Sequence, residues 1–270
     1  MMNWLGDQKT TWQPGLAVGK WSRVIVTSND RMIAVDTNGD PLLLDLDDAV
    51  ITDHEPVLAG TLNDVNYYGV RGKKISSLQY EPLRPTLIQI RSAQFVPVSA
   101  AMQVLDFSRE HQFCGQCGQP TTQSESDRGR TCDSCQLTQY PRISPCVIVL
   151  VTRRDEILLA RAPRFVDGMY STLAGFVEAG ESAEHACHRE IFEEVGVEIA
   201  EPIYQGSQSW PFKHSLMLGY RAEWRLGDIR VDGNEIIDAK WFKFDKLPKL
   251  PPKASISRGM IDAFVSERIN

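Results

Sequence analysis

Three glutamates, Glu190, Glu193 and Glu194, stand at positions i, i+3 and i+4 of a segment with helical periodicity. At this spacing their carboxylates converge on one side of a helix. Like charges so placed repel by roughly 0.2–0.5 kcal/mol per pair, and a hard divalent cation reverses the sign of that interaction. Mg²⁺ and Mn²⁺ take oxygen ligands and leave positions open for the phosphate oxygens of a substrate. Three glutamates alone fit an exposed acidic helix face better than a metal site, so the surrounding residues must decide.

The segment that carries these glutamates predicts a helix over 183–195. Ser182 suits the N-cap, and Gly196 suits the position just after the last helical turn. Apolar residues recur every four positions and predict the buried stripe: Ala183, Cys187, Ile191 and Val195. The glutamates are therefore left on another face. Arg189, four residues before Glu193, is placed to orient that carboxylate or to offset its charge.

Four of the six cysteines form two C-x-x-C pairs, namely Cys114 with Cys117 and Cys132 with Cys135. In a chain that reads without a secretion signal, such pairs favour a metal over disulfides. Four thiolates complete a tetrahedral shell, so the pattern predicts one structural Zn²⁺ per subunit that supports folding rather than chemistry. Cys146 and Cys187 have no partner at such a spacing and are expected in the core.

The composition is that of a folded protein, with 270 residues of which 42% are hydrophobic and 24% are charged. It excludes disorder as the dominant state and allows one large domain or two smaller ones. The net charge of −6 argues against a broad electrostatic grip on nucleic acid, so an anionic ligand must be held locally. The longest apolar run, Cys146 to Val151, is too short to cross a bilayer, and Asp7 interrupts any apolar export signal. We expect a soluble, cytoplasmic protein with no membrane partner.

The surrounding elements divide the chain into three expected domains: a β-rich N-terminal domain with a connecting helix at 1–111, a zinc ribbon at 112–141 and a catalytic α/β domain at 142–270. In the first, Asn38-Gly39 predicts a hairpin between Arg31–Thr37 and Pro41–Asp47. Further strands are expected at 65–70 and 86–90, and a helix that spaces two domains at 99–111. In the third, strands are expected at 147–152, 156–160, 216–224 and 239–244, and helices at 183–195 and 255–268.

The stretch from Gly175 to Val197 resembles the Nudix box, G-x5-E-x7-R-E-U-x-E-E-x-G-U, where U is a bulky aliphatic residue. It agrees at every defined position: Gly175, Glu181, Arg189, Glu190, Ile191, Glu193, Glu194, Gly196 and Val197. The chain therefore resembles the Nudix hydrolases. This resemblance implies an α/β/α sandwich as the fold of the catalytic domain, and substrates in which a nucleoside diphosphate is linked to another moiety.

A second set of residues lies beyond the helix and begins Ser207-Gln-Ser-Trp-Pro-Phe-Lys-His-Ser215. By itself this set is explained as well by a turn that leads into a strand, with the aromatic residues in the core, as by a substrate site. It resembles the S-Q-P-W-P-F-P-x-S array of the NADH pyrophosphatase subfamily, which shares the zinc ribbon. The resemblance implies hydrolysis of NADH or NAD⁺ to nicotinamide mononucleotide and AMP, and of the same bond in NAD-capped RNA. Ser209 and Lys213 replace two prolines, which leaves ADP-ribose or another dinucleotide open as the substrate. A non-catalytic zinc-ribbon protein that binds nucleic acid is the alternative from another class.

The resemblance also implies roles for individual residues. Mg²⁺ or Mn²⁺ would be held by Glu190, Glu193, Glu194, Glu235 and the carbonyl of Ala174. Glu194 is the first candidate for the base that accepts the proton of the attacking water. The nicotinamide ring would stack on Phe176 and on Tyr140, the latter donated across a homodimer. Further substrate contacts are implied for Gln208, Ser209, Trp210, Pro211, Phe212, Lys213, His214, Ser215 and Ser257, with Arg84 and Asp127 at two more weakly aligned positions.

Overall fold

The computed structural model describes residues 12–15, 17–48, 55–90, 92–124 and 127–269, without the side chains of residues 92 and 93. Asp7, the residue expected to interrupt an apolar export signal, lies outside the described residues. The described chain forms two compact units. One contains residues 12–143 together with the short loop 211–214, and the other contains residues 144–210 and 215–269. None of the helices in the described part is both long and apolar enough to span a membrane.

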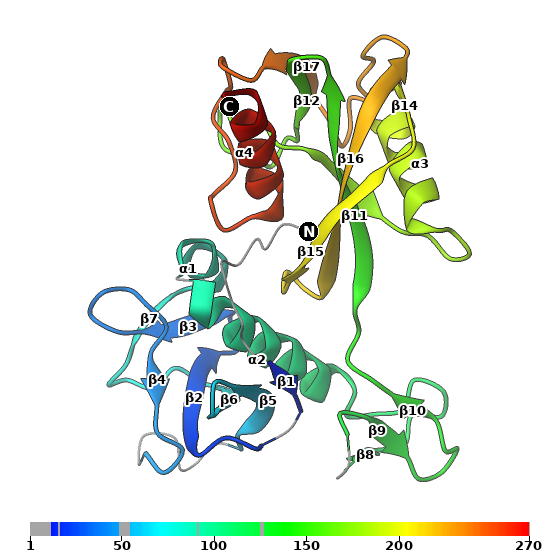
Figure 1. The fold of residues 1–270 in the computed structure, drawn as a ribbon. Coiled ribbons are helices and arrows are strands. Elements are labelled where there is room, and N and C mark those ends of the chain that lie inside the picture. Colours follow the sequence, from blue (N-terminus) through cyan, green and yellow to red (C-terminus); the bar gives the residue numbers. More distant parts are fainter. Residues whose placement is uncertain (1–11, 16, 49–54, 91, 125–126, 270) are drawn as a thin grey trace. The chain divides into compact units, whose positions relative to one another are not determined.

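The first unit is built on a mixed sheet with the strand order β1-β5-β6-β2-β3-β7 (Figure 1). Its strands are β1 (Gln13–Pro14), β2 (Trp21–Ser28), β3 (Met32–Val35), β4 (Leu43–Leu44), β5 (Val57–Leu62), β6 (Val65–Gly72) and β7 (Gln79–Pro82). Helices α1 (Leu83–Gln89) and α2 (Ser92–Glu110) follow, and α2 packs against β5 and β6. A Cβ on Gly69 would lie 2.8 Å from Leu105, so the missing side chain lets α2 approach the sheet closely.

Three expectations for this unit are wrong in detail. The turn at Asn38-Gly39 forms, but only the bridge Val35–Pro41 joins its two arms, and β4 pairs with β2 instead. Residues 86–90, expected as a strand, belong mostly to α1, where the Thr86 hydroxyl donates to the Pro82 carbonyl at 3.0 Å. The next helix begins at Ser92 rather than at residue 99 and includes Pro97. It is not a spacer between domains, because its apolar residues, such as Phe95 and Met102, are buried.

The cysteine-rich segment folds as a small antiparallel sheet within the same unit. Its strands are β8 (Thr121–Gln123), β9 (Arg130–Cys132) and β10 (Thr138–Gln139), in the order β10-β9-β8. Cys132, at the end of β9, is fully buried. The segment has few apolar residues, as its sequence indicates, so a bound metal is the natural source of its stability.

The second unit is an α/β/α sandwich, which confirms the expected fold class. Its strands are β11 (Ser144–Arg153), β12 (Glu156–Arg161), β13 (Leu173–Phe176), β14 (Glu198–Ile199), β15 (Ile203–Trp210), β16 (Ser215–Leu226) and β17 (Asp238–Lys243). The sheet order is β14-β16-β11-β12-β17, with β13 added to β11 and β15 to β16. Helices α3 (Ala183–Val195) and α4 (Ile256–Ile269) lie on opposite faces of this sheet (Figure 1).

Two apolar clusters hold the sandwich together. One joins the α3 stripe of Ala186, Cys187, Ile191 and Val195 to the sheet, and the other joins Met260 and Phe264 of α4 to its opposite face. Helix α3 has the bounds that its sequence predicts. The Ser182 hydroxyl accepts from the N–H of His185 at 3.1 Å, and Gly196 adopts the left-handed conformation with φ of 70°.

Candidate active site

The charged face of α3 is organised around the guanidinium of Arg189. It donates to both carboxylate oxygens of Glu181 at 2.8 Å, to Glu190 at 2.8 Å and to Glu193 at 3.0 Å. It also donates to the carbonyl of Phe176 at 2.9 Å, which ties the helix to the end of β13. Arg189 lowers the pKa of Glu181 to about 2. One cation therefore reduces the repulsion among three carboxylates, two on α3 and one, Glu181, just before it.

Glu194 is the acid that Arg189 does not reach. The residue is only 7% exposed, and its Oε2 atom has no hydrogen-bond partner among the described residues. Burial raises the pKa of Glu194 to about 8, and the negative charges of Glu190, Glu235 and Asp232 add to that effect. A buried carboxylate oxygen without a donor is costly in the absence of a ligand. Its position beside other acids fits a divalent cation that would satisfy it.

Glu190 lies against the β13 backbone. A Cβ on Gly175 would stand 1.9 Å from the Glu190 carboxyl carbon, so any side chain there would displace the Glu190 carboxylate. Burial raises the pKa of Glu190 despite the nearby Arg189. Ala174, whose carbonyl is the proposed fifth ligand, is the next residue back along β13 and pairs with Ile148 of β11. The structure thus places Glu190, Glu194 and the β13 backbone in one region.

The glutamate oxygens are not gathered as tightly as the sulfurs of the ribbon. Among the described residues, the four cysteines are the one group of three or more potential ligands whose ligand atoms all lie within 4.8 Å of one another. Glu190 and Glu193 instead contact Arg189, and Glu235 is exposed in the loop between β16 and β17. Among these acids, Glu194 is therefore the one that most needs a divalent cation as its partner. The other carboxylates would complete the coordination shell of that cation.

The four cysteines form a compact cluster in the ribbon. The Sγ distances are 3.5 Å for Cys114–Cys135, 3.5 Å for Cys117–Cys132 and 3.7 Å for Cys117–Cys135. Tetrahedral Zn–S bonds of about 2.3 Å put the sulfurs about 3.8 Å apart. The spacing therefore fits one zinc ion held by four sulfurs, with no open position for chemistry.

Tyr140 and Asp127, both expected near substrate, contact each other in the ribbon. The Tyr140 hydroxyl donates to the Asp127 carboxylate at 3.1 Å, and the Gly129 N–H donates to the same carboxylate at 2.8 Å. These bonds lower the pKa of Asp127 and raise that of Tyr140. Tyr140 is 57% exposed, so its ring is held at the hydroxyl end and is partly open to solvent.

The array that follows the helix is distributed over several environments. Gln208 is 2% exposed, donates to the Ala254 carbonyl at 2.7 Å and accepts from the Ile256 N–H at 2.8 Å, which fixes the start of α4. Ser257, 3% exposed, bonds to Ser171 and Thr172 at 2.9 and 2.8 Å. Both side chains form their hydrogen bonds within the protein. Any contribution they make to substrate binding would therefore be indirect, through the segments that they hold in place.

The rest of the array lies at and around the tip of the hairpin formed by β15 and β16. Ser209 and Trp210 end β15 half-buried, and Ser215 begins β16 buried. The loop Pro211–His214 belongs to the first unit, where Arg84 lies 5.5 Å from the centre of the Phe212 ring and Lys213 lies 3.6 Å from Glu110. Phe176 is 52% exposed at the end of β13.

Two residues near Glu194 are absent from the sites expected from the sequence. Asp232 and Arg164 both act on the charge of Glu194, the first raising and the second lowering its pKa. Asp232 has a local signal, because Asp-Gly-Asn before Glu235 is a sequence typical of tight turns. Arg164 lies in an irregular loop after β12, and no local pattern in the sequence points to it.

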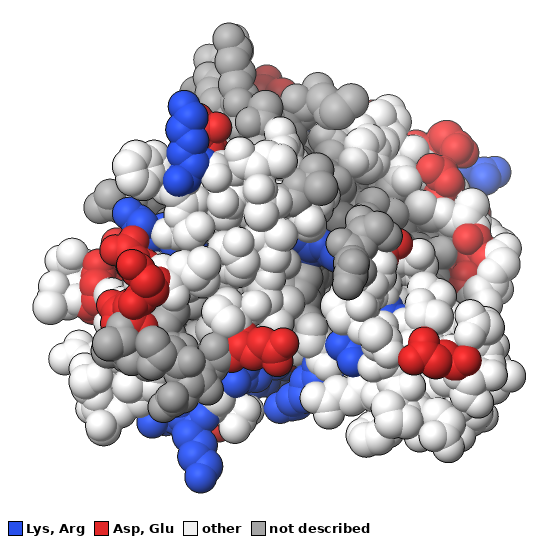
Figure 2. Space-filling model, turned by 90° about the horizontal axis from the view of Figure 1, so that it is seen from below, with Lys and Arg blue, Asp and Glu red and all other residues white. Residues whose placement is uncertain are grey.

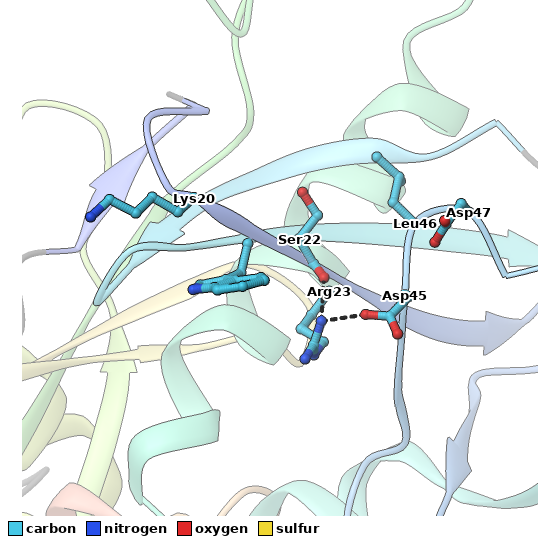
Figure 3. A pocket seen from close by; sticks show the side chains of 7 residues that line it. Lys20, Ser22, Arg23, Asp45, Leu46 and Asp47 are labelled. Carbon is cyan, nitrogen blue, oxygen red and sulfur yellow. Dashed lines mark hydrogen bonds and ion pairs between the residues drawn. The ribbon is translucent and has the colours of Figure 1, made fainter.

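A separate hollow on the first unit has a volume of about 370 Å³ (Figure 3). Its lining residues are Lys20, Trp21, Ser22, Arg23, Asp45, Leu46 and Asp47. Arg23 forms an ion pair with Asp45 across it. None of the expected site residues lines this hollow. Figure 2 shows that, on the face it draws, the described lysines and arginines form small separate groups among uncharged and acidic residues.

Comparisons with known proteins agree with this geometry. Residues 142–264 match the NUDIX domain family, and residues 109–140 match the NADH pyrophosphatase zinc ribbon domain family. The chain is 51% identical over 198 residues to the NAD-capped RNA hydrolase NudC of Pseudomonas syringae pv. syringae, covering 73% of this chain and 71% of that protein. It is 50% identical over 195 residues to the NAD-capped RNA hydrolase NudC of Pseudomonas aeruginosa, covering 72% and 70%.

Among solved structures, the NUDIX hydrolase of Nitrosomonas europaea aligns with a TM-score of 0.51 at 20% identity. The alignment covers 58% of this chain and 92% of that one, and it supports the fold alone. The Nudix box and the four-cysteine ribbon lie in different parts of the sequence, and the similarity to the Pseudomonas proteins agrees with both. The chain belongs to the NudC family of NUDIX proteins.

Proposed function

We propose that this protein hydrolyses the pyrophosphate bond of NADH and NAD⁺ to nicotinamide mononucleotide and AMP, and the same bond in the NAD cap of RNA. The observation that carries the proposal is the buried Glu194 carboxylate, whose Oε2 atom lacks a partner among the described residues while Glu190 and Glu235 act on its charge. The names of the Pseudomonas relatives support the choice of substrate.

Each candidate site residue has a role in this proposal. Glu190, Glu193, Glu194, Glu235 and the Ala174 carbonyl would hold Mg²⁺ or Mn²⁺. When bound, the ion would neutralise the phosphate oxygens and activate water. Glu194 is the first candidate for the base that would accept the proton of the attacking water, because it is the buried carboxylate of this cluster that Arg189 does not contact. Arg189 keeps Glu190 and Glu193 on the same side of α3.

Substrate recognition is assigned to the exposed aromatic rings and the array after the helix. Phe176 and Tyr140 are both more than half exposed and are free to stack on a nicotinamide ring. The proposed substrate region is completed by Gln208–Ser215, Ser257, Arg84 and Asp127. Gln208 and Ser257 contribute to it indirectly, by holding neighbouring backbone and side chains in place. The proposal includes a homodimer in which Tyr140 serves the partner's site, and the cytoplasm, where NAD(H) and RNA are available.

Product analysis on a substrate panel tests this proposal. The zinc-loaded protein is incubated with NADH, NAD⁺, ADP-ribose and NAD-capped RNA under Mg²⁺ or Mn²⁺, and the products are identified by mass. We expect nicotinamide mononucleotide and AMP from the dinucleotides, and a 5′-monophosphate end on the RNA. Faster turnover of ADP-ribose than of any NAD-containing substrate would assign the site to that alternative, and no turnover of any member would refute hydrolysis.

A further inference from the structure

The loop between β16 and β17 is fastened to the end of α3. The N–H of Arg230 donates to the carbonyl of Val195 at 2.8 Å, and the N–H of Asp232 donates to the carbonyl of Glu194 at 3.2 Å. The last carbonyls of a helix have no partner within it, and here the loop provides two donors. The loop therefore lies against the helical turn that carries Glu194.

Beyond this attachment, the loop folds around the Asp232 carboxylate. One carboxylate oxygen accepts from the N–H groups of Asn234 at 3.1 Å and Glu235 at 2.8 Å, and the other accepts from that of Ile236 at 2.8 Å. Gly233, with φ of 78°, provides the left-handed residue in the turn. Hydrogen bonds to an ionised acceptor are stronger than those between neutral groups, so this turn depends on one charged side chain.

The turn separates a buried residue from an exposed acid. Ile236 is 6% exposed and belongs to the apolar cluster beneath α3. Glu235, one residue earlier, is exposed, and its charge acts on both Glu190 and Glu194. Asp232 itself is exposed and adds nothing to the apolar core. Its three bonds fix the backbone of residues 234–236, which carries Glu235 between the turn and the buried Ile236.

We propose that Asp232 is a positioning residue that holds the backbone of Glu235 at the C-terminal end of α3, so that Glu235 and Glu194 serve the same divalent cation. The inference rests on the proposed function in taking Glu235 as a metal ligand. Asp232 acts through Glu235 rather than as a ligand itself, because both of its oxygens already accept backbone N–H groups.

The test is Mn²⁺ binding, measured by electron paramagnetic resonance on zinc-loaded protein without substrate. We expect Asp232→Ala to weaken Mn²⁺ binding about 10-fold, as is typical when a partner of a metal ligand is lost. Asp232→Asn keeps one acceptor oxygen and should fall between Asp232→Ala and the wild type. Asp228→Asn removes another exposed carboxylate of the same loop and should leave binding unchanged.

A double-mutant cycle separates positioning from a plain charge effect. If Asp232 acts through Glu235, Asp232→Ala should have little further effect on Mn²⁺ binding in a Glu235→Gln background. Equal effects in both backgrounds, or unchanged binding in Asp232→Ala, would overturn the inference. Thermal melting of each variant establishes that it is folded, and Asp232→Asn replaces Asp232→Ala in the cycle if the latter does not fold.

Two further variants distinguish failure of this inference from failure of the proposed function. Unchanged Mn²⁺ binding in Glu235→Gln, together with loss of hydrolysis in Glu194→Gln, would overturn the role of Asp232 and leave the proposed function standing. Unchanged hydrolysis in Glu194→Gln would overturn the proposed catalytic site, and the positioning role with it.

Discussion

Gly175 on β13 and Glu190 on α3 are in such close contact that a Cβ at Gly175 would lie 1.9 Å from the Glu190 carboxyl carbon. The sequence places these residues 15 positions apart within the Nudix box, and the fold brings one against the backbone of the other. The position of Glu190 therefore depends on the absence of a side chain on the neighbouring strand.

Gly175→Ala should displace the Glu190 carboxylate. We expect kcat/KM for NADH to fall about 100-fold, since small displacements in a catalytic site have effects of this size. The free energy of unfolding should fall by about 1–3 kcal/mol, as is typical for overpacking. Steady-state kinetics and denaturant unfolding measure the two effects. Gly115→Ala is the control, because its Cβ would meet nothing nearer than 3.7 Å. Full activity in Gly175→Ala would contradict the required contact.

Glu194→Gln should remove hydrolysis and stabilise the protein lacking Mg²⁺ and Mn²⁺. The pKa of Glu194 is raised to about 8 in the folded state, so between about pH 4.5 and 8 the folded protein keeps a proton that the unfolded chain has lost. Stability therefore falls as pH rises through this window, and the neutral Gln avoids that loss. We expect a gain on the order of a few kcal/mol at pH 9 and none near pH 4.

Thermal melts of zinc-loaded protein at the two pH values measure this effect. Mn²⁺ at pH 9 should raise the Tm of the wild type and change that of Glu194→Gln much less, because a ligand stabilises only the state that binds it. Equal stabilities of the two proteins across the pH range would contradict the buried, charged state of Glu194. Hydrolysis should fall by about 10²–10⁴-fold, the usual contribution of a general base.

Cys132→Ala should remove the metal from the ribbon. Cys132 is fully buried and its sulfur lies 3.5 Å from that of Cys117. Zinc content, measured by a colorimetric assay after denaturation, should fall from one ion per subunit to nearly none, and proteolysis within 112–140 should become faster. Cys187→Ala also removes a buried thiol, but from the core beneath α3, and should leave zinc content unchanged. Retention of zinc by Cys132→Ala would refute the four-sulfur site.

Tyr140→Ala should raise the KM for NADH about 10-fold, which corresponds to the loss of one aromatic stacking contact. Tyr140→Phe keeps the ring and loses only the hydrogen bond to Asp127, so its KM should rise less. The comparison uses initial rates at saturating Mg²⁺. Equal KM values in the wild type and Tyr140→Ala would show that the exposed ring does not contact the substrate.

Helix α3 and its glutamates were predictable because the information is local. Ser182, Gly196 and a four-residue apolar repeat define both ends and the buried face, and the structure has the same bounds. The pairing of β4 with β2 was not predictable, because it depends on strands distant in sequence. Pro97 obscured the first turns of α2, whose stability comes from packing against β5 and β6 rather than from local propensity.

The sequence predicts the types of the candidate ligands, but it does not predict the contacts that support them. The glutamates and cysteines occupy motif positions, whereas Asp232 acts through three backbone bonds that exist only once the loop is folded. Gln208 is similar, since its position in the array gives no sign that its amide fixes the start of α4.

The guanidinium of Arg189 joins Glu181, Glu190 and Glu193 and leaves Glu194 aside. As a result, the acidic helix carries an internal counter-ion. A divalent cation bound there would meet in Glu194 a buried carboxylate oxygen without a donor, and in Glu190 and Glu193 carboxylates that would exchange Arg189 for the ion. Metal binding would therefore be an exchange of partners.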